Sequence, residues 1–229
     1  MKIALCLSGQ ARAVKAGYEY YKKNLLSQYD VSVYAHVWDS EFANDVLSLY
    51  SPMIGFKRES VSDFSSIDRT YTRTPNAAKY PPRNTFSMFK SMYECRRLLM
   101  YSNIQYDWVI RARTDYALNV VIPFDTLDNS KIYIPNCRMT PERDFGNDQF
   151  AFGSMDTMLK YMSTFHYIQD YYDAGSSYIG EDLMSANLKK HNLIGENLVY
   201  VNMNNPFPPG KHNGTWHSLI RDDYEVFNK

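Results

Sequence analysis

The amino-acid sequence predicts a single α/β domain built on an open mixed sheet that is flanked by helices. In the first half of the chain, short apolar or β-branched runs alternate with segments of helical periodicity. In the second half, shorter strands of mixed pattern lie between further helices. The length of 229 residues and the hydrophobic content of 45% suit one core of this kind.

The first half contains three predicted strands and one predicted helix. Residues 2–7 form an apolar run without helical spacing, which ends at a Ser-Gly-Gln turn. Residues 13–28 carry apolar side chains at steps of three and four and predict a helix. Residues 31–37 are β-branched and aromatic, and residues 53–58 make a weaker strand.

The middle of the chain begins with a polar excursion at residues 60–83, which predicts a long surface loop. Asn84 or Thr85 is the expected cap of a helix over residues 86–101. The later elements are predicted strands at 107–112, 131–135, 149–152 and 198–202, and predicted helices at 155–173 and 181–190.

The amino-acid composition limits which binding partners and which cellular location are expected. Lys+Arg and Asp+Glu balance at 25 each, so no strong field favours nucleic acid or an anionic membrane. No apolar stretch reaches the roughly 18 residues that span a membrane, and no signal peptide is expected at the N-terminus. The three cysteines, Cys6, Cys95 and Cys137, form no CxxC pair, and buried free thiols favour a reducing, cytoplasmic location.

Ligands of open α/β sheets sit beyond the carboxyl ends of the strands, which makes the strand ends candidate binding residues. Ser8 and Gly9 end the first strand, and a glycine there lets the backbone approach a ligand closely. Arg12 follows at the start of a helix, and its guanidinium group has paired N–H donors that fit a diphosphate. Asp39 ends the second strand and is a candidate contact for a ribose or a base. The alternative for the segment from Ser8 to Arg12 is an ordinary turn between a strand and a helix, with Arg12 at the surface and no ligand.

The segment from Arg111 to Asp115 is the sharpest local feature. Strand alternation puts Arg111, Arg113 and Asp115 on the same side of the chain. Two guanidinium groups would suit a diphosphate, and Asp115 could hold a divalent metal that bridges the phosphates. A salt-bridged strand end is the alternative.

Two further positions could contact the phosphate groups of a bound ligand. Ser87 and Lys90 lie three residues apart and share one face of the helix over residues 86–101. Lys90 would be a point charge for a phosphate group. A solvated helix face explains the same pattern.

Three acids compete as the base that deprotonates an acceptor hydroxyl. Glu181 and Asp182 open a predicted helix, where the helix dipole favours the ionised state. Asp148 lies just before a strand and could contact the bound substrate instead. The five histidines form no HExxH or HxxxH set, which argues against a zinc enzyme.

The order of these motifs resembles that of GT-A glycosyltransferases. Phe152-Gly153-Ser154, followed after a helix by Gly180-Glu181-Asp182-Leu183, is similar to the FGG…GxGGED arrangement of β-1,4-galactosyltransferases. The Ser-Gly-Gln-x-Arg turn, the Arg-x-Arg-x-Asp strand end and the Asn-Asp-Gln-Phe-Ala segment also look like small transferases of bacterial capsule loci and large DNA viruses, such as chlorella viruses. The resemblance runs in order through nearly the whole chain.

This resemblance implies a Rossmann-like GT-A fold in one domain, with a nucleotide-binding half at residues 1–115 and an acceptor half at residues 116–229. In β-1,4-galactosyltransferases the second acid of the Glu-Asp pair is taken as the catalytic base. That comparison points to Asp182, with Glu181 left to bind hydroxyl groups.

The resemblance also implies a divalent cation, Mn²⁺ or Mg²⁺. The DxD metal motif of the family reads Arg113-Thr114-Asp115 here, so Asp115 would hold the metal. His212 or His217 would assist, because many GT-A enzymes carry a late histidine ligand. Arg113 could instead supply part of the metal's charge.

The expected function is therefore transfer of a sugar, with inversion, from a nucleoside diphosphate sugar to a glycan acceptor. The expected location is the cytoplasm, or the host cytoplasm if the protein is viral. A sugar nucleotidyltransferase is one alternative, although its first loop is usually longer and carries a lysine. A carbohydrate-binding module is another, because the 20 tyrosines offer flat rings with hydroxyl groups.

Overall fold

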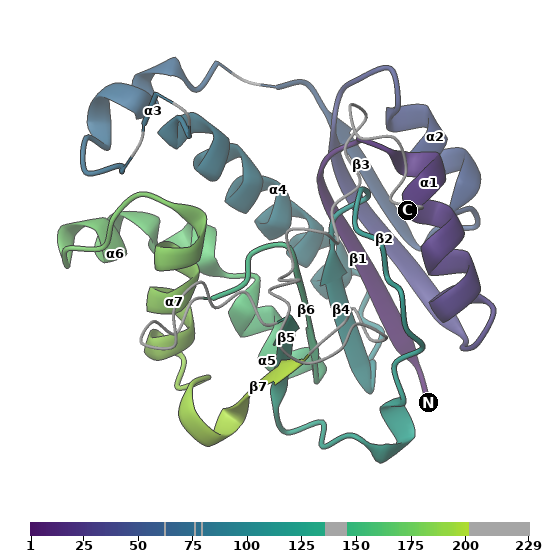
Figure 1. The fold of residues 1–229 in the computed structure, drawn as a ribbon. Coiled ribbons are helices and arrows are strands. Elements are labelled where there is room, and N and C mark those ends of the chain that lie inside the picture. The colour runs from purple at the N-terminus through teal and green to yellow at the C-terminus, as the bar shows by residue number, and fades with distance from the viewer. Residues whose placement is uncertain (62, 76, 79, 136–145, 202–229) are drawn as a thin grey trace, which may run out of the picture.

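A seven-stranded mixed sheet forms the centre of the molecule, with strand order β3-β2-β1-β4-β6-β5-β7 (Figure 1). The computed structural model describes residues 1–135, apart from 62, 76 and 79, and residues 146–201. The strands are β1 (Ile3–Gln10), β2 (Val31–Trp38), β3 (Gly55–Glu59), β4 (Trp108–Ala112), β5 (Ile132–Pro135), β6 (Phe150–Gly153) and β7 (Leu198–Val201).

Most neighbouring strands are parallel, and β6 is the exception. β1 pairs in parallel with β2 and β4, and β2 pairs in parallel with β3. β6 runs antiparallel to both β4 and β5, whereas β7 is parallel to β5. The chain moves outward from β1 to β3 and then returns to the other side of β1 as β4. The strand order therefore reverses between β1 and β4.

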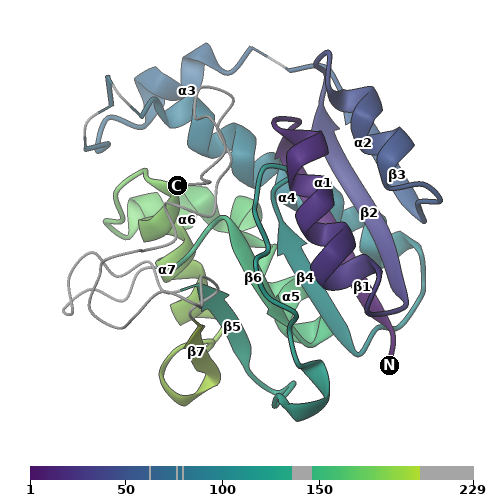
Figure 2. The ribbon, with the colours of Figure 1, turned by 45° about the vertical axis from the view of Figure 1, so that its right-hand side comes forward.

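Helices cover both faces of this sheet, which confirms the predicted α/β architecture with an open mixed sheet in one domain (Figures 1 and 2). One face carries α1 and α2, and the other carries α4 to α7. The helices are α1 (Val14–Tyr21), continued by a π-helical turn η1 (Lys22–Leu26), α2 (Ala43–Leu49), α3 (Ser65–Thr70), α4 (Pro82–Tyr101), α5 (Met155–Tyr161), α6 (Ile168–Asp173) and α7 (Gly180–Lys190).

Alternation along β1 divides the core into two layers. Ile3, Leu5 and Leu7 pack on the α1 side, whereas Ala4 and Cys6 pack on the α4 side. All five side chains are fully buried. Because β1 is covered on both faces, its apolar residues run continuously instead of alternating with polar ones.

Several element boundaries differ from the sequence prediction. β1 continues three residues beyond Leu7, because Ser8, Gly9 and Gln10 stay in register with the end of β2. The predicted loop at residues 60–83 contains α3, and α2 was not predicted. α4 begins at Pro82, whose fixed φ suits the first helical turn, so the predicted cap at Asn84 or Thr85 is wrong.

The predicted helix at residues 155–173 is divided into α5, a 3₁₀ turn η3 (Thr164–Tyr167) and α6. Ser163 and Thr164 stand at the break. Their hydroxyl groups donate to the carbonyls of Lys160 and Tyr161, at 2.6 and 3.0 Å. Such local bonds offer the backbone an alternative to the continuous helical pattern, which accounts for the interruption.

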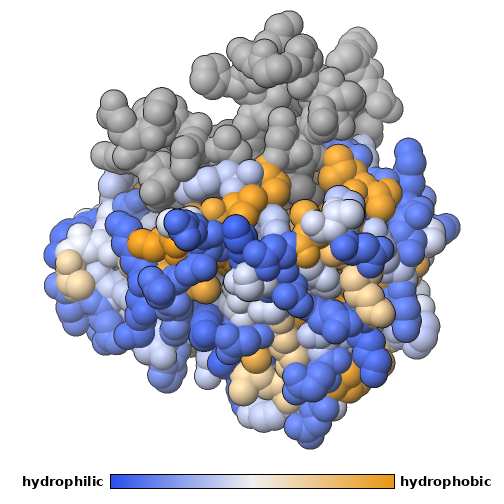
Figure 3. Space-filling view, turned by 90° about the horizontal axis from the view of Figure 1, so that it is seen from below, coloured by the Kyte–Doolittle hydropathy of each residue, from blue (hydrophilic) through white to orange (hydrophobic). Residues whose placement is uncertain are grey.

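Cys6 and Cys95 are buried free thiols, as predicted, whereas Cys137 lies outside the described residues. Among the described helices, none is long and apolar enough to cross a membrane. The face seen in Figure 3 is mainly hydrophilic, with hydrophobic side chains in separate groups.

Candidate functional site

The candidate site lies at the carboxyl edge of the sheet, where the strand order reverses between β1 and β4. β1 and β2 both end at this edge, and α1 begins there (Figure 1). An open pocket of about 330 Å³ separates the loop after β1 from the loop after β2. Its lining residues are Gln10, Ala11, Arg12, Ser40, Glu41 and Phe42.

A buried chain of hydrogen bonds fixes the backbone of Gly9 at this edge. The N–H of Gly9 donates to Ser91 Oγ at 2.7 Å, and Gly9 has a φ of 121°, which favours glycine. Ser91 Oγ also lies 2.8 Å from His36 Nδ1 and 3.0 Å from the His36 carbonyl. His36 Nε2 lies 2.9 Å from Glu59 Oε2. α4 thereby links β1, β2 and β3 through one hydroxyl group.

Replacing Ser91 with alanine is expected to lower the free energy of unfolding by about 2 kcal/mol, because the Gly9 N–H and the buried His36 ring lose their partner. Urea unfolding measures this change. Ser87→Ala is the matched control on the same helix, at a partly exposed position, and should change stability by less than about 0.5 kcal/mol. Equal effects of the two substitutions would contradict the assigned role of Ser91.

Arg111 and Ser8 point into the protein and bond to each other. Arg111 has no exposed surface, its Nε donates to Ser8 Oγ at 3.2 Å, and its Nη1 donates to the carbonyl of Asp148. Its Nη2 has no hydrogen-bond partner among the described residues. Ser8 is only 1% exposed. Neither side chain is exposed at the surface for the predicted contact with a donor, and both residues join β1, β4 and the segment before β6.

Arg113 and Asp115 form a two-point ion pair. Arg113 Nε donates to Asp115 Oδ1 at 2.7 Å, and Arg113 Nη2 donates to Asp115 Oδ2 at 2.6 Å. The Asp115 side chain is 1% exposed, whereas that of Arg113 is 22% exposed. Burial acts to lower the pKa of Arg113, but the attraction of Asp115 leaves this pKa raised. The salt-bridged alternative for this strand end is thus present in the structure.

The loop after β1 is fixed against this ion pair. The N–H of Arg12 donates to Thr114 Oγ1 at 3.3 Å, and the Thr114 hydroxyl also lies 3.3 Å from the carbonyl of Gln10. Tyr21 of α1 donates its hydroxyl proton to the carbonyl of Arg113 at 3.0 Å. The turn after β1 and the end of β4, which are about 100 residues apart in sequence, therefore form one unit.

Two acids from separate motifs meet beside these arginines. Asp148 is 8% exposed, and its carboxylate lies so close to Gly180 that a methyl group added there would come within 2.2 Å of Asp148 Oδ2. Burial raises the pKa of Asp148, and the charges of Arg111 and Arg113 oppose that shift. Burial and the neighbouring charge of Asp148 raise the pKa of Glu181 to about 7.

Asp182 has a different environment from Glu181. Its carboxylate accepts a hydrogen bond from Ser177, just before α7. Glu181, also at the start of α7, interacts electrostatically with Asp148. The structure thus brings Arg111, Arg113, Asp115, Asp148 and Glu181 together, and gives Asp182 a partner of its own.

The remaining predicted residues lie along the β2 side of the edge. Asp39 accepts from Arg58 Nε at 2.7 Å, so its carboxylate is already paired at the surface. The ammonium of Lys90 lies over the rings of Trp38 and Phe64, 5.5 and 5.4 Å from their centres. Because Trp38 ends β2, Lys90 lies at the carboxyl edge, as a phosphate contact requires. Ser87 is partly exposed one turn earlier on α4.

The described residues do not assemble a metal site at Asp115. Both of its carboxylate oxygens accept from Arg113, and no group of three or more His, Cys, Asp or Glu side chains suited to a metal is found in the described part of the chain. His212 and His217, the expected additional ligands, lie outside the described residues.

The sequence did not reveal that Ser91, His36 and Glu59 support Gly9. A polar Ser91 within the apolar stripe of α4 and a polar His36 within the apolar β2 were the available signals, since buried polar side chains need partners. No known family model matches this chain, and no curated protein is significantly similar to it in sequence.

Proposed function

We propose that this protein is a glycosyltransferase that moves a sugar from a nucleoside diphosphate sugar to a glycan acceptor, and that its sheet is of the GT-A class. The observation that carries the proposal is the placement of two chemically different regions at one carboxyl edge. A pocket whose lining includes Arg12 and Glu41 lies beside β1 and β2, and a pair of acids, Asp148 and Glu181, lies beside β4 and β6.

The pocket side suits a nucleoside diphosphate. Arg12 lines the pocket, and Lys90 lies beside the last residue of β2. α1 begins at the same edge with no acidic residue in its first turn and no side-chain cap, so its dipole and backbone N–H groups favour an anion. These features support binding of the diphosphate, with the nucleoside directed to the pocket.

The acid side suits deprotonation of an acceptor. In an inverting displacement, a carboxylate takes the proton of the acceptor hydroxyl as its oxygen bonds to the anomeric carbon and the nucleoside diphosphate leaves. We assign this base to Glu181 in place of Asp182, because Asp182 is bonded to Ser177. A pKa of about 7 suits a base that works near neutral pH. Asp148 is then a positioning residue that raises this pKa.

Thermal unfolding with a panel of nucleotides tests the proposal. UDP or GDP, or one of their sugar conjugates, is expected to raise Tm by about 5 °C or more at roughly 100 times its Kd. A preference for nucleoside triphosphates would indicate the nucleotidyltransferase instead. Stabilisation by free glycans, with no response to any nucleotide, would indicate a carbohydrate-binding module.

A further inference from the structure

The cation that faces Asp115 is part of the protein itself. A divalent metal bound by carboxylates needs oxygen atoms with lone pairs directed at the ion, and Mg²⁺ or Mn²⁺ prefers six such ligands. Both oxygens of Asp115 instead receive N–H groups of Arg113, at 2.7 and 2.6 Å. A metal at Asp115 would have to displace a guanidinium that is matched to the carboxylate at two points, and the Asp115 side chain is only 1% exposed.

The nearest other acids do not complete a metal site. Asp148 is under the influence of Arg111 and Arg113, whose positive charges repel a divalent ion. Glu181 has its pKa raised to about 7, so it competes for a proton near neutral pH. Two arginines therefore lie among the three acids. Their positive charges nearly balance the negative charges of the carboxylates without a metal ion.

Three positive side chains, those of Arg12, Lys90 and Arg113, lie at the carboxyl edge where the phosphates are proposed to bind. Arg113 keeps 22% of its side chain exposed while it pairs with Asp115, and its Nη1 is not used in that pair. Arg12 is joined to the same strand end through Thr114, and Lys90 precedes Ser91, which binds Gly9. Guanidinium groups bind phosphate through paired N–H donors, so these side chains offer a diphosphate the charge that a metal would supply.

We infer that Arg113 takes the place of a divalent cation at Asp115, so that a nucleoside diphosphate binds to this protein without metal, through Arg113, Arg12 and Lys90. The ligand part of this inference rests on the proposed function. In this inference Asp115 is a positioning residue, because its ion pair with Arg113 orients the guanidinium group of Arg113 toward the phosphates.

Titration of the full chain with Mn²⁺ alone, followed by electron paramagnetic resonance, tests the metal part. The spectrum of free Mn²⁺ is expected to keep its intensity with the wild-type protein and with Asp115→Asn. Loss of the free signal with the wild type, restored by Asp115→Asn, would overturn the inference. This experiment needs no nucleotide, so its result does not depend on the proposed function.

Calorimetry with UDP and GDP tests the ligand part. The Kd of the nucleotide that binds is expected to agree within about twofold in EDTA and in Mn²⁺ or Mg²⁺, because no metal joins the complex. Arg113→Met should weaken binding in EDTA by about tenfold or more, since a charge-assisted contact is lost. Arg113→Lys, which keeps the charge but loses the fork, should show an intermediate loss and covers the case in which Arg113→Met fails to fold.

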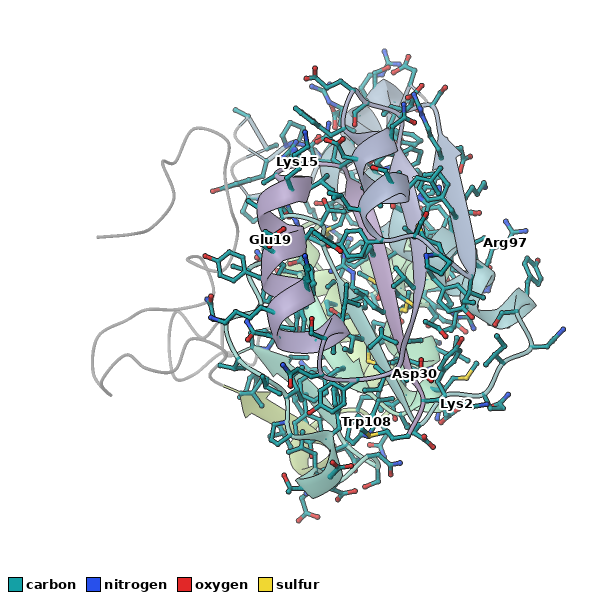
Figure 4. All side chains as sticks on the ribbon, turned by 90° about the vertical axis from the view of Figure 1, so that its right-hand side faces the viewer. Lys2, Lys15, Glu19, Asp30, Arg97 and Trp108 are labelled. Carbon is teal, nitrogen blue, oxygen red and sulfur yellow. The ribbon has the colours of Figure 1, made fainter. Side chains whose placement is uncertain are left out.

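Arg97→Met is the matched control, because it removes an exposed arginine of α4 that pairs with Glu94, away from the carboxyl edge (Figure 4). Its nucleotide affinity should equal that of the wild type. Binding that disappears in EDTA and returns with Mn²⁺ would overturn the inference. Failure of every nucleotide to bind in both conditions would refute the proposed function and the ligand part together, while the Mn²⁺ titration still decides the metal part.

Discussion

Replacing Glu181 with glutamine is expected to lower the turnover of sugar transfer by about 10²- to 10⁴-fold, the range for loss of a general base. Glutamine has the shape of glutamate but cannot take the acceptor proton. The Kd of the nucleotide should stay unchanged, because Glu181 interacts with Asp148 and does not line the pocket. Turnover is measured as release of nucleoside diphosphate from the sugar nucleotide found by thermal unfolding, with glycan acceptors present.

The pH dependence of turnover separates a base from a structural residue. A base must be deprotonated, so turnover should rise with pH and level off above the pKa of Glu181, which is about 7. Below that value the rate should fall about tenfold for each pH unit. Asp148→Asn removes a negative neighbour that raises this pKa, and should move the rise to lower pH. Glu181→Gln should lack the rise.

Asp182→Asn is the matched control at the next position of α7. Its turnover is expected to stay within about tenfold of the wild type, because the Asp182 carboxylate is bonded to Ser177. If Asp182→Asn is inactive while Glu181→Gln keeps its turnover, the base is Asp182, as the resemblance to β-1,4-galactosyltransferases implies.

The sheet could be predicted from the sequence because strands and helices have different periods. All seven strands were expected near their observed places, since covered strands such as β1 are continuously apolar. The short helix α2 was missed because it lies in a segment of mixed polarity. The extra length of β1 depends on pairing with β2, which local patterns do not record. Contacts between segments that are distant in sequence therefore determine where an element such as β1 ends.

The candidate site was predictable in its parts but not in the direction of each side chain. Strand alternation placed Arg111 and Arg113 on one side of the chain, yet Arg111 is buried against Ser8 whereas Arg113 pairs with Asp115 near the surface. Which arginine faces water depends on where the strand ends and the chain turns. The meeting of Asp148 with Gly180 depends on how α7 packs beside the segment before β6, which sequence spacing does not reveal.

Replacing Gly17 with alanine is expected to lower the free energy of unfolding by about 2–3 kcal/mol. Gly17 is buried on the inward side of α1, whereas Lys15 and Glu19 lie on its outward side (Figure 4). An added Cβ would come within 2.0 Å of the carbonyl oxygen of Thr114, a backbone atom that cannot turn aside. α1 would have to move away from the end of β4. Urea unfolding measures the loss.

The sign of this effect distinguishes packing from helix propensity. Alanine favours a helix over glycine by about 1 kcal/mol, so propensity alone predicts a more stable protein. Ala16→Gly, one position earlier and partly exposed, is the matched control and should cost about 1 kcal/mol through propensity alone. A stabilised Gly17→Ala protein would show that α1 does not pack against Thr114. Displacement of Thr114 should also weaken nucleotide binding, because its hydroxyl joins the turn of Arg12 to the Arg113–Asp115 pair.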